Sequence, residues 1–108
     1  MITIEVTQRD IDKGTRGSPY YCPVALAIAQ YLGVHPDEEA QVQVITNTVN
    51  IPDLAYNRDP RVAGWLPRFQ IYNLDSQVKT WIQRFDDRLP SEPFTLHLWE
   101  QGVATMTT

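Results

Sequence analysis

Residues Lys13–Ala29 read KGTRGSPYYCPVALAIA, and this stretch carries the strongest local signals in the chain. Its first half is a basic, glycine-containing loop, and its second half is an apolar segment that follows the single cysteine, Cys22. Proline at the first helical position sacrifices no helical hydrogen bond, so a helix is predicted from about Pro23 to Leu32. Because nearly every face of this helix is apolar, we expect it to be buried and to end at Gly33.

Periodicity predicts the elements on either side of this helix. Alternating apolar and polar residues indicate strands at 2–6, 41–46 and 94–98, with a weaker strand at 68–72. A second helix is predicted after the capping residue Asp75, where large apolar residues follow at i, i+3, i+4 and i+7. A helical turn at 8–13 is also expected. The inward positions of these elements form the predicted core: Ile4, Val6, Leu26, Ile28, Val44, Ile82, Phe85, Phe94 and Leu96.

The order strand, helix, strand, strand, helix, strand predicts an α+β fold. We expect a four-stranded, mainly antiparallel sheet with two packed helices. This βαββαβ order matches the split βαβ plan of ferredoxin-like domains, and other α+β arrangements share it. Residues 1–100 are predicted to form a single domain and residues 101–108 a loose C-terminal tail. The segment 47–67 is rich in proline and is predicted to be irregular.

Composition narrows the classes of function. The chain has 108 residues, a net charge of −4 and nine basic residues with no dense basic run. Binding of duplex nucleic acid needs a basic face and is not expected. The longest apolar run, Cys22–Leu32, is too short to span a membrane. One cysteine permits no internal disulfide, so a cytoplasmic protein is predicted.

The loop before the apolar helix is the first candidate site. Arg16, Gly17, Ser18 and Cys22 are predicted to bind a small anion, because backbone N–H groups and the helix dipole converge at such a position. Arg16 would offer a bidentate donor, or it would instead pin the loop through carbonyls or an acid. Cys22 is either a low-pKa nucleophile or a buried structural residue. Neither glycine-rich phosphate-binding motif is present.

A second candidate site lies in the irregular segment. Tyr56, Arg58, Arg61 and Trp65 supply the residue types that most often anchor protein interfaces. Histidine, cysteine and carboxylate spacings match no metal-binding pattern, so neither a metal nor another cofactor is predicted.

Two segments resemble a group of short uncharacterised proteins from bacteriophage and bacterial genomes. The first runs DIDKGTRG from Asp10 and continues with CPVALAI from Cys22. The second comprises VKTWIQRFD from Val78 and PFTL from Pro93. The resemblance implies a phage origin. It carries no known activity and no functional residues.

Three functions follow from these features. The leading hypothesis is a small non-enzymatic interaction protein, phage-encoded, that binds a host or phage protein. The first alternative is a binder of a nucleotide or other small anion at the Arg16–Pro23 helix start. The second alternative is a thiol enzyme that uses Cys22. The pattern does not predict an oligomeric state.

Overall fold

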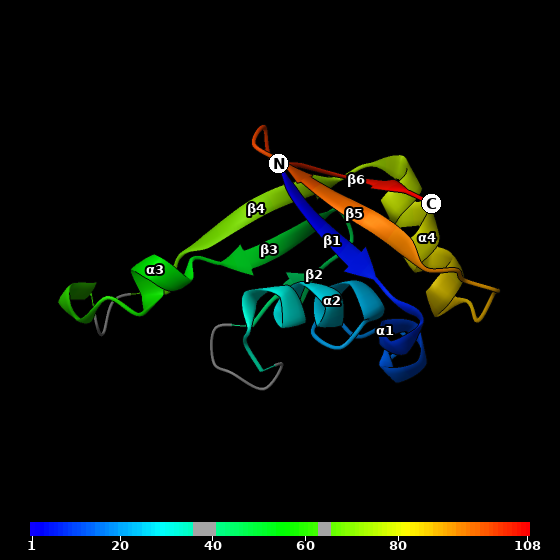
Figure 1. Cartoon of the computed structure of the whole chain (residues 1–108), viewed down its shortest axis with the longest axis horizontal. Coiled ribbons are helices and arrows are strands. Elements are labelled where there is room, and N and C mark those ends of the chain that lie inside the picture. The colour runs from blue at the N-terminus through cyan, green and yellow to red at the C-terminus, as the bar shows by residue number, and fades with distance from the viewer. Residues whose placement is uncertain (36–40, 63–65) are drawn as a thin grey trace.

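The computed structural model describes residues 1–35, 41–62 and 66–108 (Figure 1). Six strands form one sheet, and helices of different lengths lie between them. The strands are β1 (Ile2–Val6), β2 (Gln43–Val44), β3 (Thr48–Pro52), β4 (Phe69–Leu74), β5 (Phe94–Trp99) and β6 (Val103–Thr107). The helical elements are α1 (Gln8–Lys13), α2 (Pro23–Leu32), α3 (Leu54–Asn57), the 3-10 turn η1 (Pro60–Val62) and α4 (Ser76–Asp86). None of the helices in these ranges is long and apolar enough to cross a membrane.

Local chemistry sets the ends of the helices. Thr7 and Asp10 form a capping box at α1, in which each side chain pairs with the backbone N–H of the other residue. Asp75 caps α4 by accepting a hydrogen bond from Val78 N at 2.9 Å. Gly33 ends α2 in the left-handed conformation, with φ 72°, which glycine adopts without a Cβ penalty. The two long helices are therefore confirmed where the sequence placed them.

The sheet differs from the predicted one. Its strand order is β1-β5-β6-β4-β3-β2, and all pairs are antiparallel except β4 with β6. The prediction of a four-stranded, mainly antiparallel sheet with two helices is wrong, because the sheet is six-stranded and mixed. The predicted βαββαβ order of a ferredoxin-like domain is therefore also wrong. The parallel pair is short and joins only Asn73 to Val103 and Leu74 to Ala104.

Strong curvature lets one sheet enclose the core. Helix α2 packs against both β1 and β2, which are the two edge strands, so the sheet curls around this helix. Helix α4 packs against β4 and β6 in the middle of the sheet (Figure 1). Both helices contribute buried side chains to the same core cluster as the strands. On the opposite face of the sheet, His97 and Trp99 hydrogen-bond Thr107 and Thr105.

Most of the predicted core is confirmed. Ile4, Val6, Ile28, Val44, Phe85, Phe94 and Leu96 are buried. Leu26 and Ile82 are only half-buried. Ile82 packs against the edge of the core and lines a surface cleft, and helical periodicity alone does not resolve such partial exposure.

The two segments predicted to be irregular contain strands. Residues 103–107 form β6 between β5 and β4, so the prediction of a loose tail is corrected. Within 47–67, residues 48–52 form β3, with Val49 and Ile51 buried. Pro52 obscured this strand because proline cannot donate to a ladder, and here it occupies the last position of the strand, where a donor is least needed.

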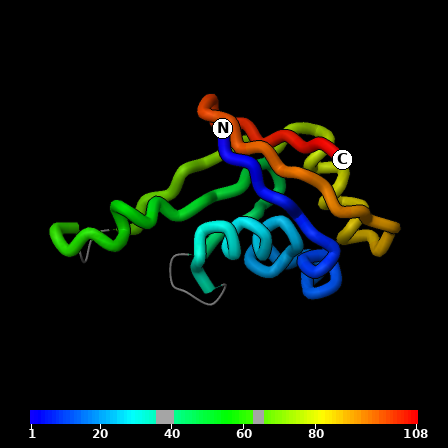
Figure 2. The backbone as a smooth tube through the Cα atoms, viewed as in Figure 1, coloured from blue at the N-terminus to red at the C-terminus, as the bar shows by residue number. Residues whose placement is uncertain are grey.

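Strands β3 and β4 extend beyond the rest of the sheet and form an arm with the segment that joins them. We call residues 48–74 the arm and residues 53–68 its tip. Figure 2 shows this ribbon leaving the rest of the backbone, and the molecule reaches 46 Å along its longest axis. At the base of the tip, the partly buried side chain of Leu54 packs against the core.

Candidate functional site

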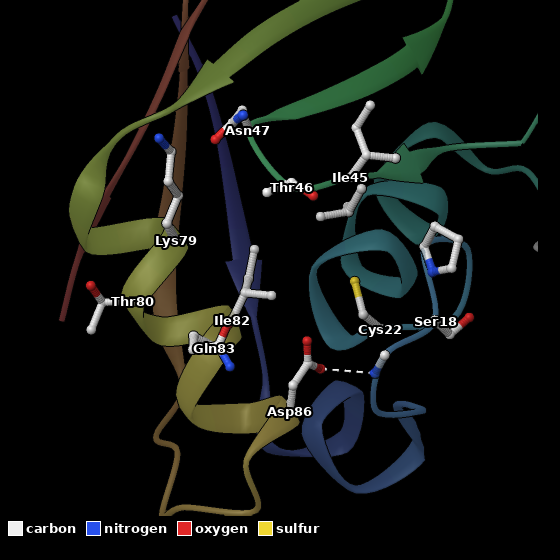
Figure 3. Close-up of a pocket in the computed structure, with 13 residues that line it drawn as sticks. Ser18, Cys22, Ile45, Thr46, Asn47, Lys79, Thr80, Ile82, Gln83 and Asp86 are labelled. Carbon is white, nitrogen blue, oxygen red and sulfur yellow. Dashed lines mark hydrogen bonds between the residues drawn. The ribbon is translucent and has the colours of Figure 1, made fainter.

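A cleft of about 550 Å³ lies between α4, the loop before α2 and the turn from β2 to β3 (Figure 3). Three segments that are distant in sequence form its walls. Helix α4 presents charged and polar side chains, and the opposite walls are mostly small or apolar. The lining residues used below are Gly17, Ser18, Cys22, Val44, Asn47, Lys79, Ile82, Gln83 and Asp86.

Three of the four predicted ligand-binding residues lie together in this cleft. Gly17, Ser18 and Cys22 line one wall. Arg16 is not part of the lining, because its guanidinium lies over the ring of Phe85, 5.2 Å from the centroid. The arginine therefore fastens the loop to α4 through an aromatic ring, whereas the alternative drawn from the sequence was a bond to carbonyls or an acid.

Several backbone donors around the helix start are already used within the protein. Gly17 N donates to Asp86 Oδ1 at 2.9 Å, and Tyr21 N donates to Ser18 Oγ at 3.1 Å. Pro23 has no N–H, and Leu26 N donates to Cys22 O at 3.0 Å. An anion at Gly17 would have to displace the Asp86 carboxylate.

The Cys22 sulfur is buried, with 3% of the residue exposed. Burial raises the pKa of the thiol to about 11, and the nearby Asp86 carboxylate adds to this effect. The backbone N–H groups of Ala25 and Val24 lower the pKa but offset only part of the shift. His97 lies on the other face of the sheet, bonded to Thr107. Cys22 is thus a protonated thiol near neutral pH, because burial outweighs the backbone donors that would favour a thiolate.

This environment predicts slow chemistry at Cys22. We expect iodoacetamide at about pH 8 to alkylate the native protein far more slowly than the urea-unfolded protein, in which the thiol pKa is near 9.

The raised native pKa of Cys22 also predicts how stability depends on pH. The thiol loses its proton at a lower pH in the unfolded chain than in the native protein, so the free energy of unfolding falls as the pH rises from about 9 to 11. The measurement is urea unfolding across this range. Cys22→Ala should show a shallower decline, and equal slopes for the two proteins would contradict the assignment.

Hydrogen bonds that do not involve the core order the tip of the arm. The Asn57 side chain pairs with the backbone of Arg68 in both directions: Nδ2 donates to Arg68 O at 3.1 Å, and Oδ1 accepts from Arg68 N at 2.7 Å. Asp53 N donates to the same carbonyl at 2.9 Å, and Asp53 Oδ1 caps α3 by accepting from Tyr56 N. These bonds continue the β3–β4 pairing past the last strand residues.

The predicted partner-binding residues are distributed around this tip. The Arg68 guanidinium stacks on the Tyr56 ring, 3.8 Å from its centroid. The Arg61 side chain is 87% exposed and pairs with Asp59, with 2.6 Å between Nη2 and Oδ2. This guanidinium lowers the pKa of the Asp59 carboxyl. Arg58 is the C-terminal capping residue of α3. Trp65 lies outside the described residues.

Sequence reasoning missed the residues that organise both sites. In the cleft these are Asp86 and Lys79, and in the tip they are Asn57, Asp59 and Arg68. The helical spacing of Lys79 and Asp86 was readable, since positions seven apart share a face. Their position beside the loop before α2 was not, because it depends on how α4 packs.

Within the described ranges, no three histidine, cysteine or carboxylate side chains gather in a way that would hold a metal ion. Comparison of the chain with protein-family models, with curated proteins and with solved structures finds no match. The resemblance to short phage and bacterial proteins therefore stays a prediction.

Proposed function

We propose that this is a small, non-enzymatic interaction protein that uses the tip of its arm to bind another protein, of a bacteriophage or its bacterial host. One observation carries the proposal: beyond Leu54, which packs against the core, the described part of the tip is ordered by its own polar contacts. Fixing the backbone costs roughly 1–2 kcal/mol per residue. Burial of the described tip residues offsets little of this entropy cost, because none of them is fully buried. A pre-ordered projection instead lowers the entropy cost of binding a partner.

The surface chemistry of the tip supports a protein partner. Its residues include three arginines and two aspartates, so the tip is basic within a chain of net charge −4. The guanidinium of Arg68 on Tyr56 makes a rigid aromatic platform, and Leu66 nearby is 89% exposed. Arginine and tyrosine are the residues that most often dominate interface energetics. A partner with an acidic patch around an apolar pocket would match this arrangement.

A cytoplasmic location fits the same proposal. The single cysteine is a buried free thiol, so folding does not depend on forming a disulfide in an oxidising compartment. If the protein is phage-encoded, this location is the host cytoplasm.

The proposal predicts that contacts with the partner concentrate at the tip. A photo-crosslinking amino acid at position 66 is expected to capture one dominant bacterial protein, and the same group at Leu89, which is exposed on another part of the molecule, is not. Arg61→Ala should weaken capture at position 66 and leave the melting temperature almost unchanged, because the described ion pair of Arg61, with Asp59, lies at the surface.

Arg88→Ala provides the matched control, since it also removes an exposed arginine but lies outside the arm. It should capture the partner as well as the wild-type protein does. Equal crosslinking from positions 66 and 89, or no effect of Arg61→Ala, would place the binding surface elsewhere.

A further inference from the structure

The cleft beside α4 is a preformed cavity. Val44 N donates to Pro19 O at 2.8 Å and joins β2 to the loop before α2. Gly17 N joins that loop to α4 through Asp86, and Leu74 N donates to Asn47 O at 2.9 Å, which holds the β2–β3 turn against β4. Each wall is thus hydrogen-bonded to a neighbouring element. The volume of the cleft, about 550 Å³, lies within the range of small-molecule sites.

Two opposite charges stand at the ends of the cleft. Lys79, Gln83 and Asp86 are spaced at i, i+4 and i+7, so they share the face of α4 that borders the cavity. A rise of 1.5 Å per residue separates the backbone positions of Lys79 and Asp86 by about 10 Å. Figure 3 shows Lys79 near Asn47 at one end, and at the other end Asp86 with the hydrogen bond that it accepts from Gly17 N.

Neither charge is neutralised by an ion pair in the part of the chain that the structure describes. The Lys79 ammonium makes no hydrogen bond or ion pair with a described residue. Asp86 uses Oδ1 to accept from Gly17 N, and Oδ2 has no described partner. Between the two ends, Cys22, Val44 and Ile82 supply an apolar lining.

We propose that the cleft binds a short zwitterionic peptide, with its α-ammonium group at Asp86 and its α-carboxylate at Lys79. An extended chain advances about 3.3–3.6 Å per residue, so a peptide of two or three residues spans about 7–10 Å. This length is comparable with the separation of the Lys79 and Asp86 backbone positions along α4. An apolar side chain of the peptide would pack on the lining between them. A polyanion such as a nucleotide is repelled by Asp86, and a polyamine is repelled by Lys79. This site is independent of the arm.

The test is a titration of the full-length protein with alanyl-leucine, followed by amide NMR shifts. We expect shifts that centre on Gly17, Ser18, Lys79, Gln83 and Asp86. Hydrogen bonds to charged groups contribute enough that removing either terminal charge should raise the Kd on the order of tenfold or more. N-acetyl-alanyl-leucine and alanyl-leucine amide are the probes that remove each charge in turn.

Variants provide the reciprocal evidence. Asp86→Asn retains an oxygen for Gly17 N but loses the charge, and it should weaken alanyl-leucine yet leave the acetylated form unaffected. Lys79→Gln should likewise weaken binding of alanyl-leucine and leave binding of alanyl-leucine amide unchanged. Asp12→Asn and Lys13→Gln, two exposed residues outside the cleft, are the matched controls and should bind as the wild type does.

Three outcomes would overturn the proposal. Equal Kd values for the free, acetylated and amidated peptides would remove the role of the charges. Inorganic phosphate that shifts the cleft resonances as strongly as the dipeptide would show a simple anion site at Lys79. The absence of shifts with millimolar peptide, in variants and wild type that give the same folded spectrum, would show that the cleft does not bind this class.

Discussion

Phe85→Ala is expected to lower the melting temperature by roughly 10–30 °C. Phe85 is 4% exposed and lies in the last turn of α4. Its ring is parallel to that of Trp81 at 6.0 Å between centroids, and Trp81 in turn packs against Phe94 at 4.7 Å. Truncation of a buried phenylalanine typically costs about 3–5 kcal/mol, since the cavity left behind closes only in part.

The effect should exceed simple loss of burial because Phe85 also supports the cleft. The guanidinium of Arg16 lies on the outer face of its ring and holds the loop that carries Gly17 against α4. Thermal unfolding followed by circular dichroism measures the change. Leu26→Ala is the matched control: this leucine is half-buried, and its truncation should cost clearly less. Equal losses from the two variants would mean that α4 does not pack as described.

Gly14→Ala is expected to destabilise the protein by about 1–3 kcal/mol, although its backbone is one that alanine accepts readily. Gly14 has φ −68° and ψ 148°, so no conformational strain arises. A Cβ at this position would lie 2.6 Å from both Cδ and Cγ of Pro23 and 2.9 Å from its nitrogen. These are atoms of a buried ring at the first position of α2, and they cannot rotate away.

A double-mutant cycle separates this clash from other causes. In a Pro23→Ala background the ring is absent, so Gly14→Ala should cost little, or stabilise the protein by restricting the unfolded chain. Urea unfolding of the four proteins measures the coupling. Destabilisation of the same size in both backgrounds would show that the contact with Pro23 is not the reason for glycine at position 14.

The long helices were predictable because their signals are local. Capping by Asp75, proline at the first position of α2 and glycine at its end each act within a few residues. The same holds for β1 and β5, whose strict alternation buries Ile4 and Leu96. Such patterns survive packing because they serve local and tertiary structure together.

Strand β6 was not predictable on the same basis. Its sequence, VATMT, contains one fully buried residue, Ala104, and little apolar surface. Strand β6 is stabilised by its two neighbours. Strand β5 pairs with every residue of β6, and β4 adds two parallel pairs. These contacts join residues distant in sequence, and a local pattern does not contain them.

The candidate sites divide along the same line. The sequence by itself determined the amphipathic α4, the buried α2 and the loop that contains Gly17 and Cys22, since short-range hydrogen bonding and periodicity specify each of them. Only the tertiary structure decided that Asp86 accepts from Gly17, that burial keeps the Cys22 thiol protonated and that Lys79 borders a cleft. The physical reason is that desolvation and charge pairing depend on which surfaces the curled sheet brings together, and that arrangement is set by contacts across the whole chain.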